Sequence, residues 1–115
     1  MDNIKIFKYP GPKPSLLMLL NVNGENKCWV VQNGRELKST RNRIAFELTY
    51  ETLCKEEGLE LCEEGKLSVE YYKKKKIKFT PKGLEKFSGN YIFYIPSWGF
   101  HTKNKIWVLI PSVNK

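Results

Sequence analysis

The sequence has very few of the residues on which most catalytic and metal centres depend. It contains one histidine, His101, and one aspartate, Asp2. A single histidine excludes a two-histidine acid–base pair, and the shortage of aspartate argues against a carboxylate site for divalent metal ions. The sequence also lacks a glycine-rich phosphate loop, a nucleophile elbow and a zinc-protease motif. We therefore expect no cofactor and no metal ion.

Cysteine is also sparse, and the chain has only Cys28, Cys54 and Cys62. Together with His101 these residues would be enough in number for a zinc site, but the chain has no Cys-x-x-Cys pair. An odd number of cysteines without a secretory signal is typical of free thiols in a reducing compartment. We therefore expect unpaired thiols and a cytoplasmic protein, of host-cell or viral origin.

Long apolar runs are absent as well. The longest strongly apolar run, residues 16–20, is far too short to cross a bilayer. It follows Pro10, Pro12 and Pro14 and has no small-residue cleavage site after it, so it does not resemble a signal peptide. We interpret the run as a buried strand and expect no membrane partner.

What the chain does have is the composition of one folded domain spanning residues 1–115, with 41% hydrophobic and 13% aromatic residues. Turn-forming residues recur at short intervals, and Asn33-Gly34 predicts a tight hairpin turn, so the fold should be rich in strands. Residues 91–95 and 106–110 are continuously apolar. We expect both to be central strands that are buried on both faces and ended by a proline.

Residues 43–57 fit two interpretations. The alternation of apolar and polar residues favours a strand over residues 43–50 followed by a short helix that ends at Gly58, but one continuous helix is the alternative. A second helix is predicted from Thr80-Pro81 to Phe87, because threonine caps helices and proline suits their first turn. The predicted fold class is α+β and β-rich, with a single small twisted sheet or partial barrel and two short helices.

The charge of the chain is laid out in three blocks. Residues 1–45 hold 8 lysines and arginines against 3 acidic residues, residues 46–70 hold 2 against 8, and residues 71–115 hold 10 against 1. An acidic middle therefore lies between two basic ends, and the net charge is +8. At the second boundary, residues 70–79 combine a dense run of lysines with aromatic residues on either side, a pattern that indicates a surface for polyanions.

The lysine run is the candidate site. Because it lies between predicted strands 67–72 and 77–80, it should form a hairpin tip whose ammonium groups can spread around a phosphate backbone. Tyr72 offers a stacking face for a base, and the basic loop at residues 38–43 adds groups that contact phosphates and base edges. We predict a non-catalytic protein that binds DNA or RNA. The predicted contacts are Lys38, Arg41, Arg43, Tyr72, Lys73, Lys74, Lys75, Lys76 and Lys78.

Two other functions stay open at this point. The acidic residues 46–70 fit a solvated face, but they could also dock on a basic protein and make the chain a protein-interaction or inhibitor module from a mobile element. His101 lies in the loop between the last two predicted strands, where it could serve a small metal-independent ribonuclease as acid or base. The apolar strands near the C-terminus could also pair across a homo-oligomer.

Overall fold

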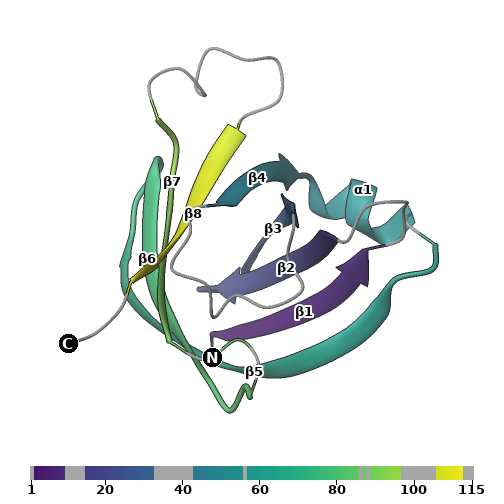
Figure 1. Ribbon diagram of the computed structural model, residues 1–115, viewed down its shortest axis with the longest axis horizontal. Helices are drawn as coiled ribbons and strands as arrows, with labels where there is room; N and C mark the ends of the chain where they lie inside the picture. The colour runs from purple at the N-terminus through teal and green to yellow at the C-terminus, as the bar shows by residue number, and fades with distance from the viewer. Residues whose placement is uncertain are drawn as a thin grey trace.

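A computed structural model describes residues 2–9, 15–32, 43–55, 57–85, 87, 89–96 and 106–112. Eight strands and one helix lie within these ranges, and the strands form a closed antiparallel barrel in the order β1-β2-β3-β4-β8-β7-β6-β5 (Figure 1). The elements are β1 (Asn3–Tyr9), β2 (Ser15–Val22), β3 (Glu25–Gln32), β4 (Arg43–Leu48), α1 (Tyr50–Lys55), β5 (Glu60–Tyr72), β6 (Lys76–Lys82), β7 (Asn90–Tyr94) and β8 (Ile106–Ser112).

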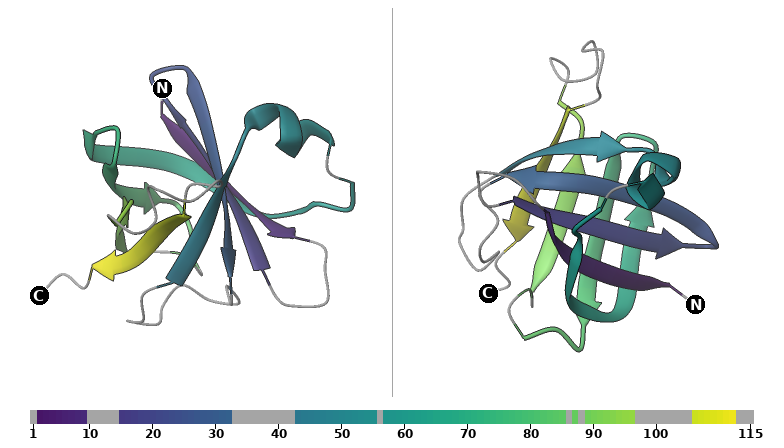
Figure 2. Two further views of the ribbon diagram at one scale, coloured as in Figure 1. Left: turned by 90° about the horizontal axis from the view of Figure 1, so that it is seen from above. Right: turned by 90° about the vertical axis from the view of Figure 1, so that its right-hand side faces the viewer.

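The barrel is built from two halves of four strands. Within each half, every strand pairs with the next strand along the chain. Two long-range ladders, β1 with β5 and β4 with β8, join the halves. Figure 2 shows α1 lying outside the barrel wall, and in the chain it connects the last strand of the first half to the first strand of the second half. Because every strand pairs on both sides, the barrel has no free strand edge.

Aromatic rings fill the middle of the barrel. The ring of Trp29 stacks on Phe93 with centroids 4.3 Å apart and meets Trp107 edge to face at 5.5 Å. Phe79 stacks on the other side of this group, 5.6 Å from Phe93. These inward positions follow from the alternation of side chains along each strand. Aliphatic side chains complete the interior: Ile4, Ile6, Leu16, Met18, Leu20, Val22, Val31, Ala45, Leu67, Ile77 and Leu109.

β5 is the longest strand, at 13 residues, and it curves around the barrel (Figure 1). Its first half pairs with β1 and its second half with β6. Gly65 lies where the two ladders meet, and a Cβ added there would be 2.3 Å from the carbonyl oxygen of Lys82. Only glycine allows the backbones to approach so closely.

The helix α1 creates a second, smaller core outside the barrel. Its N-terminus is capped by Thr49, whose Oγ1 accepts a hydrogen bond of 3.2 Å from the backbone N–H of Thr52. Leu53 packs on Leu17 and Cys28, which point outward from β2 and β3. The outer face of these two strands is therefore covered by a helix.

The predicted α+β fold is wrong, because the protein is a closed barrel with one short helix among its described residues. The predicted helix at residues 80–87 is wrong as well, since Thr80 and Pro81 belong to β6. Pro81 is tolerated there because the pairing of β6 with β7 ends at Phe79. At position 81 the ladder to β7 therefore needs no backbone N–H, which proline lacks. Its side chain instead points inward, opposite Leu67.

Other local predictions are confirmed. Residues 43–57 form a strand followed by a short helix, and the lysine run lies in a turn between β5 and β6. Residues 91–95 and 106–110 supply β7 and β8, which pair with each other. The expectation that these two strands are buried on both faces is wrong, because Ile92, Tyr94 and Ile110 on their outer faces are half-buried. The predicted turn at Asn33-Gly34 lies outside the described residues.

Replacing Gly65 with alanine is expected to destabilise the protein by about 1–3 kcal/mol, because the new Cβ would press on the backbone of Lys82. Urea unfolding measures the change. Ser68→Ala, at an exposed position on the same strand, is the control and should change the free energy of unfolding by less than about 0.5 kcal/mol. Equal effects of the two substitutions would contradict the close approach of β5 and β6.

The three thiols are expected to react at different rates with a thiol-modifying reagent. Cys54 and Cys62 are exposed, whereas Cys28 is fully buried. Burial, followed by the nearby charges of Glu47 and Cys54, raises the pKa of Cys28 to about 11. Two thiols should therefore react quickly in the folded protein and the third only on unfolding. A Cys28→Ala variant should lose the slow reaction and keep the two fast ones. Equal rates of modification for all three thiols would contradict the burial of Cys28 beneath α1.

Candidate nucleic-acid interface

Three lysines, Lys73, Lys74 and Lys75, join β5 to β6, and a fourth, Lys76, begins β6. The backbone N–H of Lys73 donates to the carbonyl of Lys76 at 2.8 Å, and the N–H of Lys76 donates back at 3.4 Å. This leaves Lys74 and Lys75 at the tip, and all four side chains are exposed. The tip is also held to the end of β7, because the N–H of Ile95 donates to the carbonyl of Lys75 at 2.9 Å. We name Lys73, Lys74, Lys75 and Lys76 together the lysine turn.

Tyr71 gathers two of these charges on its ring. The Nζ atoms of Lys73 and Lys76 lie 5.6 Å and 5.7 Å from the ring centroid, which is the range of a cation–π contact. The contact draws flexible side chains together beside the turn. The result is a compact positive cluster on the outer face of the barrel.

Lys78 continues the row of cations along β6, but its charge has a partner. Its Nζ lies 2.8 Å from Oε2 of Glu70 on the neighbouring strand. The hydrogen bond to Glu70, followed by the charge of that carboxylate, raises the pKa of Lys78. Lys74, in contrast, makes no ion pair with any described residue. The available positive charge is therefore greatest at the turn.

The structure turns Tyr72 toward the inside of the barrel, where its half-buried ring packs against the core. The ammonium group of Lys27 lies 5.6 Å from its ring centroid and 5.9 Å from that of Trp107. Trp107 in turn donates from Nε1 to Oε1 of Glu47 at 2.8 Å. Burial, followed by the charges of Glu25 and Glu47, raises the pKa of Tyr72 to about 12.

A bulge explains why Tyr71, and not Tyr72, faces outward. Leu67 and Val69 face the core, so strict alternation along β5 would place Tyr71 inside and Tyr72 outside. The register of β5 against β6 shifts between Val69 and Tyr71, which reverses the two tyrosines. No residue pattern in the sequence marks this bulge.

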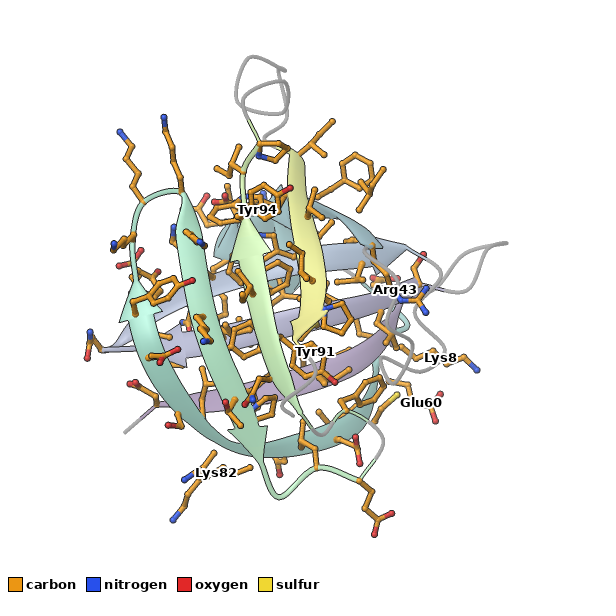
Figure 3. All side chains as sticks on the ribbon, turned by 60° about the vertical axis from the view of Figure 1, so that its left-hand side comes forward. Lys8, Arg43, Glu60, Lys82, Tyr91 and Tyr94 are labelled. Atoms are coloured by element: carbon orange, nitrogen blue, oxygen red, sulfur yellow. The ribbon has the colours of Figure 1, made fainter. Side chains whose placement is uncertain are left out.

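The second predicted basic cluster is not joined to the lysine turn by the described part of the chain. Arg43 opens β4, which is separated from β6 by β8 and β7, and its side chain shares the inward face of β4 with Ala45. Figure 3 shows Arg43 on the other side of β7 and β8 from the β5–β6 turn. Lys38, Arg41 and His101 lie outside the described residues.

No family model matches this chain, and no curated protein matches it. Within the described ranges, no three side chains of the metal-ligating types come together. The helix that the structure describes, α1, has 6 residues, and no described helix has the length and apolar character needed to span a membrane.

Tyr91, which is buried, and Tyr72, whose hydroxyl group is buried, are expected to make the protein less stable in strong alkali. Burial and nearby carboxylates raise the pKa values of Tyr72 and Tyr91 from 10.0 to about 12. The unfolded chain releases these protons at lower pH, so the stabilisation is complete below about pH 10 and is lost as the pH rises to about 12. Urea midpoints between pH 9 and 12 measure this loss, and Tyr72→Phe should reduce it. Titration of every tyrosine near pH 10 in the folded protein would contradict the burial of these hydroxyls.

Proposed function

We propose that this protein binds nucleic acid through the lysine turn and has no catalytic activity of its own. The observation that carries the proposal is the turn itself, in which four exposed lysines project from the barrel and two of them gather on Tyr71. Lysine ammonium groups at such a tip can neutralise several phosphates at once. The release of condensed counterions then drives binding.

The distribution of acidic residues supports this choice of surface. β5 carries Glu60, Glu63 and Glu64 in its first five residues, at the end of the strand opposite to the lysine turn. Near the turn only Glu70 is acidic among the described residues of β5 and β6, and Lys78 already pairs with it. A polyanion would therefore meet net attraction at the turn and repulsion at the start of β5.

The type of cation indicates how the protein would recognise its ligand. Lysine is a compact, mobile point charge and lacks the planar fork with which arginine reads guanine. The described part of the interface holds lysines and a tyrosine, groups that contact phosphate and ring faces without reading a base sequence. We therefore propose binding with little sequence preference.

Removing the turn charges is expected to weaken binding to every oligonucleotide. The variant carries Lys73→Ala, Lys74→Ala and Lys75→Ala, and it retains Lys76 because that residue lies within the β6 ladder. The slope of log affinity against log salt should fall by up to about 2 for a single strand, since each phosphate contact contributes about 0.7. Fluorescence anisotropy with short DNA and RNA at several salt concentrations measures both quantities.

A matched control separates local contacts from overall charge. Lys5, Lys8 and Lys55 are exposed and lie on β1 and α1, so replacing them with alanine removes the same number of charges from the net charge of +8. The control variant should retain most of the affinity and the salt slope. Equal losses in the two variants, or no binding by the unaltered protein at low salt, would contradict the proposed function.

A further inference from the structure

A second surface of the barrel is apolar and has no described element covering it. Side chains that point outward from β4, β8 and β7 share this surface, and their inward neighbours Ala45, Trp107 and Phe93 fix their direction. We name it the apolar wall, and its members are Ile44, Phe46, Ile92, Tyr94, Ile106, Val108 and Ile110.

The strand register shows that the apolar wall is continuous. Ile44 pairs with Val108, and Val108 pairs with Tyr94, so these three form one row across the three strands. Ile110 pairs with Ile92 in the next row. Val108 lies at the centre and is 8% exposed, whereas Ile44 at the margin is 44% exposed. Ile44 is the exposed member of the wall and the members around Val108 are otherwise half-buried, so apolar side chains form a continuous, partly exposed surface of the kind that marks interaction sites.

The rim of the apolar wall carries positive charge. The row of Tyr94 continues into Lys76 on β6, and the row of Ile92 continues into Lys78, whose charge is already paired with Glu70, so Lys76 supplies the available charge at this rim. No acidic residue belongs to the wall itself. A partner therefore needs an apolar stripe bordered by carboxylates on the side that meets β6.

The barrel already shows what kind of element suits such a surface. On β2 and β3 the outward Leu17 and Cys28 are covered by α1, whose Leu53 is 6% exposed. We infer that the apolar wall docks a protein partner through an amphipathic helix whose apolar stripe is flanked by acidic residues. Aliphatic side chains suit this partner better than nucleic acid, because bases bind best to aromatic or hydrogen-bonding groups. A second copy is disfavoured because each copy carries a net charge of +8.

A synthetic peptide tests this inference. It has about 18 residues, with leucine at helical spacing and glutamate at the remaining positions. One control peptide has the same composition in a scrambled order, and a second has lysine in place of glutamate. Calorimetry with the whole protein should show binding of the first peptide alone. Binding of the scrambled peptide with equal affinity, or no binding of the first peptide at low salt, would overturn the inference.

Three protein variants locate the contact. Ile44 and Leu61 are 44% and 47% exposed, and Leu61 lies on β5, away from the apolar wall. Ile44→Ser should weaken peptide binding by about tenfold, whereas Leu61→Ser should leave it unchanged. Ile92→Ser provides a second test within the wall, and circular dichroism checks that each variant is folded. Equal effects of Ile44→Ser and Leu61→Ser would overturn the proposed location.

Two further measurements distinguish the alternative occupants. Ile44→Ser should leave oligonucleotide affinity unchanged, so an equal loss of oligonucleotide binding would assign the wall to nucleic acid and overturn the inference. Sedimentation of the unaltered protein should show one species at all concentrations. Self-association that Ile44→Ser abolishes would instead assign the wall to a second copy. Peptide binding is tested by Ile44→Ser and oligonucleotide binding by the substitutions at Lys73, Lys74 and Lys75, so this inference and the proposed function can fail separately.

Discussion

Closure of the barrel depends on two ladders between distant parts of the chain. β1 pairs with β5, and β4 pairs with β8, so neither half of the protein can complete its sheet without the other. Closure turns one face of every strand inward and brings the rings of Trp29, Phe93 and Trp107 together. The buried aromatic area then stabilises the closed form, because apolar burial is the main favourable contribution to folding.

The same constraint decides what the outer surface can do. Once the inward positions are filled by apolar residues, function is left to the turns and to the outward side chains. At the β5–β6 turn these are lysines around Tyr71, and on β4, β8 and β7 they are mainly isoleucines. α1 covers a third outer region over β2 and β3. The barrel thus presents a cationic tip beside an apolar wall, two outer surfaces of different chemistry.

Local residue patterns were enough to predict local elements of the structure, but they could not predict which distant strands pair. Alternation at residues 43–50 and the lysines between two apolar segments correctly predicted β4 with α1 and the β5–β6 turn. Closure of the barrel could not be predicted, because no local residue pattern indicates that β1 pairs with β5. Pro81 misled the prediction because a strand tolerates proline where its neighbour has ended. The outward position of Tyr71 beside the lysines could not be predicted, because a bulge leaves no mark in the residue pattern.

The most direct test of the central claim is to map an added oligonucleotide onto the barrel by nuclear magnetic resonance. The backbone amide signals of the folded protein are followed while a short single-stranded oligonucleotide is added at low salt. Nucleic-acid binding at the lysine turn predicts changes concentrated at residues 71–78 and unchanged signals at the start of β5, where Glu60 and Glu64 lie. No changes, or changes centred away from the turn, would contradict the assignment of this surface to nucleic acid.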